Sequence, residues 1–254
     1  MKRNLLSARM AAIAVQLCLI ALIVMGFSGC VIVSLHELDT VAAKGDPEIY
    51  QLTVGKYSAI KVEGYLNIRY NAAASDTVTL SVPSNVREYY SVNVINDELV
   101  IRTTRRITFP DNARPVLTVS TPVLNRLTIE GAGTFTAQDK ISSNSLNLTI
   151  RGACSGKAEL DVASLSADIS GAGKFELSGR AGAASLSLSG AGDLDALSLE
   201  TREAKVNLSG AGTVRVNCLL NLDINASGVG TVVYRGSPSL SLHKSGMVSV
   251  RRVD

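Results

Sequence analysis

The feature that most constrains this chain is a glycine motif that recurs through its C-terminal half. Seven segments share the pattern, from "LTIEGAGTFTA" at Leu127 to a weaker copy, "LHKSGMVSVRR", at Leu242. Their first glycines follow one another at intervals of 18 to 21 residues. A fixed period of this length is the signature of an array in which each repeat packs only on its neighbours. The sequence therefore predicts a repeat fold.

Within each copy, apolar residues and glycines alternate with polar residues. In "LSLSGAGDLDA", Leu186, Leu188, Gly190, Gly192 and Leu194 are all even-numbered. A period of two is typical of a β-strand, and it continues through the glycines. The parity slips before the next copy, which indicates a second corner. The chain is thus predicted to be all-β, a parallel β-helix or β-solenoid with rungs of about 18–21 residues.

Glycine lets a backbone bend sharply and lets opposite walls of a thin coil approach each other. We interpret the repeated glycines as structural corner or waist positions. They are Gly131, Gly133, Gly152, Gly171, Gly173, Gly190, Gly192, Gly210, Gly212, Gly228 and Gly230. Aromatic residues make up 4% of the chain and Trp is absent, so the core is expected to be narrow and aliphatic.

Stacked rungs would align their outward residues into polar columns, in which short side chains hydrogen-bond along the coil. One column comprises Thr128, Thr149, Asp168, Ser187, Asn207 and Asn225. The neighbouring column comprises Glu130, Arg151, Ser170, Ser189, Ser209 and Ser227.

The first 29 residues have the pattern of an export signal. Lys2, Arg3 and Arg9 precede an uncharged run over residues 10–29. The run ends in "GFSGC", in which two small residues precede Cys30, as in a bacterial lipobox. The sequence therefore predicts a signal helix and lipidation at Cys30, which would anchor the chain to a membrane.

Two other fates of this leader stay open. The uncharged stretch continues to Leu35, which is long enough for an uncleaved membrane anchor. Phe27 stands where a lipobox usually has Leu, and ordinary signal cleavage is the second alternative. All three place the domain outside the cytoplasm. We expect an envelope location, as an outer-membrane lipoprotein that faces the periplasm or the cell surface.

The predicted organisation has three parts. Residues 1–29 form a lipoprotein-type signal peptide, residues 30–48 a tether, and residues 49–254 the β-solenoid domain. Within that domain, residues 49–122 are β-rich but irregular and cap one end of the coil, and residues 123–254 hold the Gly-x-Gly repeats.

Several of these segments together resemble a known family. "LTIEGAGTF", the repeated "LSGAG" rungs and the upstream "INDELVIRT" are similar to the putative auto-transporter adhesin, head GIN domain family. The resemblance implies an exported parallel β-helical domain of Gram-negative envelopes. It transfers no catalytic residue.

Charge and cysteine content exclude some classes of function. The chain has 25 basic and 22 acidic residues, and loss of the three leader cations leaves the two signs equal. A nucleic-acid partner is not expected, because phosphate binding needs a concentrated basic face. Cys154 and Cys218 would lie about three rungs apart, too far for a disulfide, and are predicted to be buried free thiols.

The sequence offers few groups for chemistry. His36 and His243 are the only histidines, too few for a histidine metal site or a Ser-His triad. No catalytic residue, metal or cofactor is predicted, and the chain is not expected to be an enzyme. The alternative is a polysaccharide-active β-helix enzyme that uses surface carboxylates. Its candidates are Asp193, Asp195, Asp168, Glu176 and Glu159.

The function predicted from the sequence is that of a non-enzymatic cell-envelope lipoprotein with an adhesin-like or scaffold binding domain. Its ligand would be a glycan or an envelope protein. Asn207, Asn225, Thr213 and Thr231 are expected on the exposed surface, where they either bind a ligand or only solubilise the coil.

Self-association is expected along the side of the coil. Arg251, Arg252 and Asp254 would protect its C-terminal end from pairing with another chain.

Overall fold

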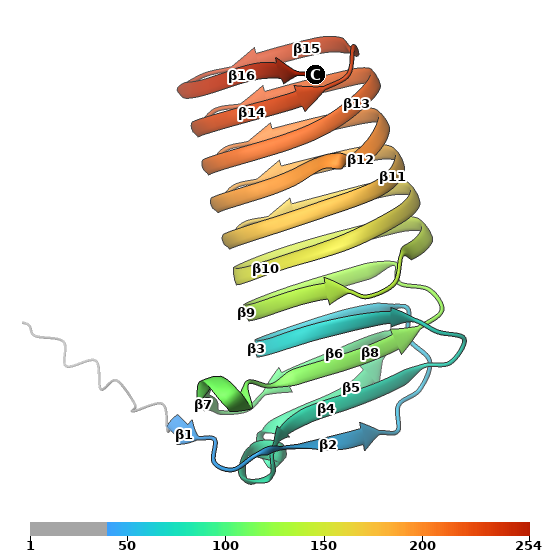
Figure 1. Ribbon diagram of the computed structural model, residues 1–254, viewed down its shortest axis with the longest axis vertical. Coiled ribbons are helices and arrows are strands. Elements are labelled where there is room, and N and C mark those ends of the chain that lie inside the picture. The colour runs from blue at the N-terminus through green and yellow to red at the C-terminus, as the bar shows by residue number, and fades with distance from the viewer. Residues whose placement is uncertain (1–39) are drawn as a thin grey trace, which may run out of the picture. The chain divides into compact units, whose positions relative to one another are not determined.

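The computed structural model describes residues 40–254, which form one all-β unit (Figure 1). The predicted leader, Cys30 and residues 30–39 of the predicted tether lie outside the described residues. Within the described residues, β1 and the start of β2 fall in the segment assigned to the tether, so strands occupy part of it.

Eight strands and two 3-10 helices precede the regular repeats in the described residues. They are β1 (Thr40–Ala42), β2 (Pro47–Leu52), β3 (Ala59–Ala72), β4 (Thr77–Pro83), β5 (Tyr90–Ile95), β6 (Glu98–Thr103), β7 (Arg106–Thr108) and β8 (Val116–Thr121), with 3-10 helices η1 (Ser84–Tyr89) and η2 (Asp111–Ala113). The strands of the repeats are β9 (Arg126–Ala137), β10 (Ile141–Ile169), β11 (Ala172–Leu188), β12 (Ala191–Leu208), β13 (Ala211–Ala226), β14 (Val229–Arg235), β15 (Ser239–Lys244) and β16 (Met247–Val253).

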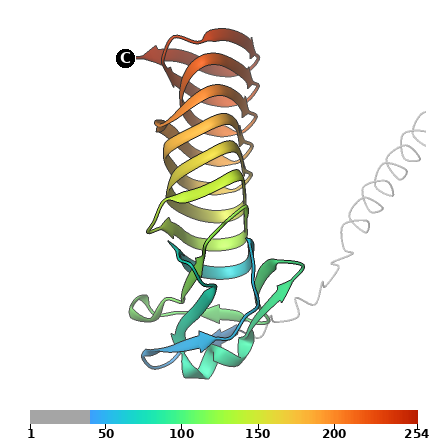
Figure 2. The same ribbon diagram turned by 90° about the vertical axis from the view of Figure 1, so that its right-hand side faces the viewer.

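The repeats wind into a β-solenoid, as the sequence predicts. From β9 to β16, each rung lies parallel to the next, and Figure 2 shows the coil from its side. The long strands run along one face, bend, and return along the other (Figure 1). The register follows the repeat, because Ala172 pairs with Ala191 and Ala191 pairs with Ala211.

The first rung of the coil is β3, although its sequence predicts a place in the irregular part. β3 pairs with β9 without a shift, from Ala59 opposite Arg126 to Gly64 opposite Gly131. Residues 73–125 are inserted between these two rungs. They contribute β4 and β8, which form an antiparallel sheet with β2 from before the first rung, and the hairpin of β5 and β6. β6 and β8 also pair with β3, so the insertion covers the outer edge of the first rung.

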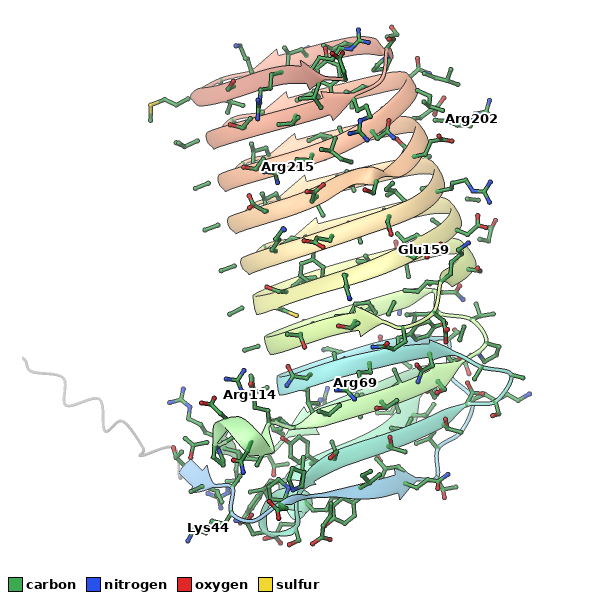
Figure 3. All side chains as sticks on the ribbon, in the orientation of Figure 1. Lys44, Arg69, Arg114, Glu159, Arg202 and Arg215 are labelled. Atoms are coloured by element: carbon green, nitrogen blue, oxygen red, sulfur yellow. The ribbon has the colours of Figure 1, made fainter. Side chains whose placement is uncertain are left out.

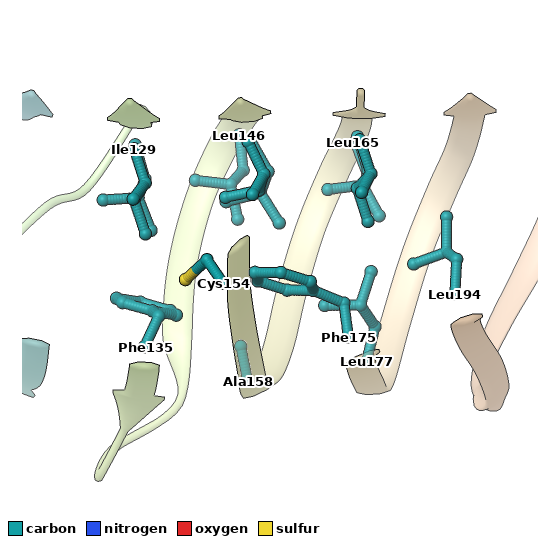
Figure 4. Close-up of a cluster of buried hydrophobic side chains, with 14 of the residues drawn as sticks. Ile129, Phe135, Leu146, Cys154, Ala158, Leu165, Phe175, Leu177 and Leu194 are labelled. Atoms are coloured by element: carbon teal, nitrogen blue, oxygen red, sulfur yellow. The ribbon is translucent and has the colours of Figure 1, made fainter. Parts of the chain in front are cut away.

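The core is a stack of aliphatic layers between the two faces. Inward residues of successive rungs lie over one another, as in the series Leu186, Val206 and Ile224, and all three are fully buried. Phe135 and Phe175 are in register with Gly156 on the rung between them, where a β-carbon would lie 2.6 Å from the Phe175 ring. Figure 4 shows these rings with aliphatic side chains around them. Large and small residues thus alternate to fill the coil.

The glycine columns control the spacing between rungs. A β-carbon on Gly171 would lie 1.8 Å from the carbonyl oxygen of Gly152, and one on Gly190 would lie 1.8 Å from that of Gly171. The second column behaves alike, because a β-carbon on Gly173 would lie 2.0 Å from the Cys154 carbonyl oxygen. The side chain would therefore point at the preceding rung. Close approach of neighbouring rungs, more than that of opposite walls, requires glycine here.

Candidate functional site

The outward residues form columns in the register that the sequence predicts. Asp168 pairs with Ser187, which pairs with Asn207, which pairs with Asn225. The Asn207 amide donates a hydrogen bond to the Ser187 hydroxyl across 3.2 Å. Asn207, Asn225, Thr213 and Thr231 are half-buried. These four side chains therefore offer less surface to a ligand than the sequence suggested.

Neighbouring columns enclose axial grooves, and the longest of those described crosses five rungs. It has a volume of about 540 Å³. Its floor is the backbone of the inward series Leu165, Ala184, Ala204, Leu222 and Leu240. One wall comprises Ser164, Ala183, Glu203, Asn221 and Ser239, and the other comprises Ser166, Ser185, Lys205, Asp223 and Ser241.

The centre of this groove carries both donors and acceptors. On one wall, the Asn221 amide donates a hydrogen bond to the Glu203 carboxylate across 3.2 Å. On the other wall, Lys205 pairs in register with Asp223 on the next rung. The two carboxylates, the ammonium group and the amide lie among serine hydroxyls above the backbone of the inward series. This arrangement suits hydrogen bonding to an extended molecule that bears many hydroxyl groups.

Charged residues form a separate network at the first rungs. Lys61 contacts Glu63 at 2.8 Å and Glu130 at 3.3 Å, and Arg151 contacts Glu130 at 2.9 Å. Arg102 contacts Glu63 at 2.8 Å, and the bonds from Lys61 and Arg102 lower the pKa of Glu63. Because each charge already has an opposite neighbour, this network serves the stacking of β3, β6, β9 and β10.

Three of the five carboxylates proposed for the alternative enzyme share one hollow of about 450 Å³. Glu159 contacts Lys140 at 3.2 Å, and Asp195 lies 3.8 Å from Arg215. Glu176 contacts Lys174, whose hydrogen bond lowers the Glu176 pKa.

A general acid of a glycosidase needs a raised pKa, which is the opposite shift. The two remaining candidates belong to different columns of outward residues. Asp193 is in register with Thr213, whereas Asp168 is in register with Ser187.

Cys154 and Cys218 are free and buried, as predicted. The Cys218 thiol donates to the Asn221 carbonyl oxygen across 3.0 Å. Burial raises the pKa of the Cys154 thiol to about 11, which disfavours the reactive thiolate. His243 stacks in register on Asn225 in another hollow of the surface.

Within residues 40–254, no three His, Cys, Asp or Glu side chains gather closely enough to hold a metal ion. Over the same stretch of the chain, no helix has the length and apolar character needed to cross a membrane.

The groove has no counterpart among the sequence predictions. Its residues belong to the second strand of each rung, read as "SLS", "AAS", "EAK", "NLD" and "SLS". The available signal was the recurrence of two small or polar residues around one inward residue at the repeat period. Without glycine to mark them, these triplets lack an evident register.

Solved structures share this architecture. A protein from Bacteroides fragilis entitled "putative adhesin" matches with a TM-score of 0.78 and 20% sequence identity. The match covers 84% of this chain and 100% of the Bacteroides chain. Two proteins from Parabacteroides distasonis, entitled "putative adhesin" and "Putative lipid binding protein", match with TM-scores of 0.65 and 0.66. Each is 20% identical and covers 85% of this chain and 100% of its own. At this identity the likeness shows the fold alone.

No curated protein matches the chain. A family model does match residues 56–238, which include the β3 rung, the insertion and most of the repeats. The adhesin-like β-solenoid therefore belongs to the family described as "Putative auto-transporter adhesin, head GIN domain".

Proposed function

We propose that this chain is a non-enzymatic envelope protein whose solenoid binds an uncharged, extended glycan. The observation that carries the proposal is the five-rung groove with hydroxyl, amide, carboxylate and ammonium groups on its walls. At a strand spacing of about 4.8 Å, five rungs extend over about 19 Å, which accommodates several linked sugars. Glu203, Lys205 and Asp223 are two acidic residues and one basic residue, and this acidic excess favours a neutral ligand over an anionic one.

Binding without turnover is the expected activity. The three candidate carboxylates that share one hollow, Glu159, Glu176 and Asp195, are each paired with a cation, and Lys174 lowers the pKa of Glu176. These groups suit ion pairing better than proton donation to a leaving group. Family membership agrees with this view, because the family is described as an adhesin domain.

A glycan array probed with the full chain tests the proposal. We expect selective retention of neutral linear glycans and no release of reducing ends. Release of reducing ends that is lost in Asp195→Asn would make the chain an enzyme. Capture of one envelope protein, with no glycan retained, would favour a scaffold.

The leader supports a second part of the proposal, a lipid anchor at Cys30. Cys30→Ser should release the chain from the membrane fraction and abolish labelling by a fatty-acid analogue. Unchanged membrane retention, with no label in the wild type, would instead indicate an uncleaved anchor.

A further inference from the structure

The last rung of the solenoid has one unpaired edge in the described structure. β15 pairs only with β13, and β16 pairs only with β14. At the other end of the coil, β6 and β8 cover the first rung. The final rung therefore presents a row of backbone N–H and C=O groups without strand partners among residues 40–254.

The inward residues of this last rung extend the apolar core to the end of the coil, where it is partly exposed. Leu240 and Leu242 stack on the buried residues Leu222 and Ile224, but they are 40% and 39% exposed. On the other face, Val250 stacks on fully buried Val232. One further layer of apolar side chains would complete the core at this end.

In both terminal strands, a basic residue takes the inward position that follows the two apolar residues. Lys244 stacks on buried Ala226, and Arg252 stacks on half-buried Tyr234. Arg252 donates to the Ser237 hydroxyl across 2.9 Å, and neither cation forms an ion pair with another residue of the described unit. The two strands share one pattern of inward residues, in which two apolar residues at alternate positions are followed by a basic one. The pattern runs from Leu240 to Lys244 in β15 and from Val248 to Arg252 in β16.

We propose that this edge accepts an extended strand of another protein with the complementary pattern of two alternate apolar residues followed by an acidic one. The added strand would hydrogen-bond to the free backbone edge, place its apolar residues over Leu240 and Leu242, and pair its carboxylate with Lys244. β16 offers the same arrangement through Val248, Val250 and Arg252. Strand addition of this kind takes affinity from the backbone and specificity from alternate side chains.

Two other occupants fit the edge less well. A second copy meeting this one end to end would pair its terminal strands antiparallel with these, so that each cation would face an apolar position of the other copy and find no carboxylate. A membrane would have to take unpaired backbone groups into hydrocarbon, which costs several kcal/mol for each group. A strand satisfies the backbone groups and the cations together. This edge shares Leu240 with the last rung of the groove, but Lys244 and Arg252 lie outside the groove. Variants of these two cations therefore test the edge, and variants of the groove walls test the glycan proposal.

The test uses the full chain with Cys30→Ser, so that a lipid anchor does not contribute. A labelled peptide, Glu-Thr-Val-Thr-Val-Thr-Glu, carries the acid at both ends and fits either strand direction. Its binding is followed by fluorescence anisotropy. We expect binding that is abolished when the valine amides are N-methylated, because the methyl groups block backbone hydrogen bonds.

Charge reversal provides the specificity arm. The double variant Lys244→Glu with Arg252→Glu should bind the peptide about tenfold more weakly and should bind the lysine version of the peptide better than the wild type does. Arg69→Glu, which reverses an exposed cation on β3 at the other end of the coil, is the matched control and should leave peptide binding unchanged.

Several results would overturn the proposal. They are equal binding of the acidic and lysine peptides, full binding of the N-methylated peptide, or no binding at all. A dimer that depends on Lys244 and Arg252 would assign the edge to a second copy. Binding to phosphatidylserine vesicles that depends on both cations, without peptide binding, would assign it to a lipid surface.

Discussion

At the scale of single residues, steric contact between rungs explains the glycines. Gly171 lies so close to the preceding rung that a β-carbon would overlap the Gly152 carbonyl oxygen. Sequence alone identified these positions, because the motif recurs at the repeat period. It did not reveal Gly64, the first member of the column, because Leu66 replaces the second glycine there and the insertion separates β3 from β9.

Gly171→Ala should therefore destabilise the solenoid by about 3 kcal/mol, because two backbones must separate to admit the methyl group. Gly55→Ala is the matched control, since no atom lies within 4 Å of the position that its methyl group would take. Its effect should stay within about 0.5 kcal/mol. Urea unfolding of both variants measures the difference. Equal stabilities would refute the steric role of the glycine column.

The Cys154 thiol gives a pH-dependent prediction at the same scale. Burial raises its pKa to about 11, whereas an unfolded thiol ionises near about 8.5. The folded chain therefore holds this proton to higher pH than the unfolded chain. Its contribution to stability is complete below the unfolded pKa and is lost as the pH rises towards about 11.

Urea unfolding of the wild type and Cys154→Ala at about pH 8 and about pH 10.5 tests this sign. The wild type should lose about 2 kcal/mol more than the variant over that interval. The buried tyrosines titrate in both proteins, so their effect cancels in the comparison. A larger loss in Cys154→Ala would contradict the assignment.

At the scale of elements, the rung is the unit of structure. Alternation and period predict β9 to β16 well, because each copy repeats the same strand and corner. The antiparallel strands β2, β4 and β8 were not predicted in their arrangement. Their pairing depends on contacts between segments far apart in the chain, and no repeat specifies that register.

Removal of a whole rung should preserve the fold. Deletion of residues 191–210 joins Gly190 to Ala211, and Ala211 then takes the place of Ala191 opposite Ala172. The shortened chain should unfold cooperatively at a lower temperature, because each rung contributes its own contacts with two neighbours. Circular dichroism during heating measures this.

Deletion of residues 191–200 is the control for that experiment. It removes only part of a rung, so the remaining strands lose their register and their inward parity. This chain should lack a cooperative transition. A half-rung deletion as stable as the whole-rung deletion would show that the rung is not the structural unit.

At the scale of the whole molecule, the described unit combines a closed first rung, a side groove and an open last rung. Composition predicted the narrow aliphatic core, because few aromatic residues are present. It could not locate the groove, which depends on which columns become neighbours once the rungs stack. Figure 3 shows how side chains cover the coil along its length. Any binding by such a surface depends on several rungs at once.

The central claim is that the groove is the glycan-binding surface. Calorimetric titration of an array-selected glycan tests it most directly, with the full chain and two variants of the same strand. Ala183→Trp places a large ring in the groove wall, and Ala172→Trp places the same ring on an exposed corner position. We predict that binding is lost in Ala183→Trp and retained in Ala172→Trp. Equal affinity of the wild type and Ala183→Trp would contradict the account.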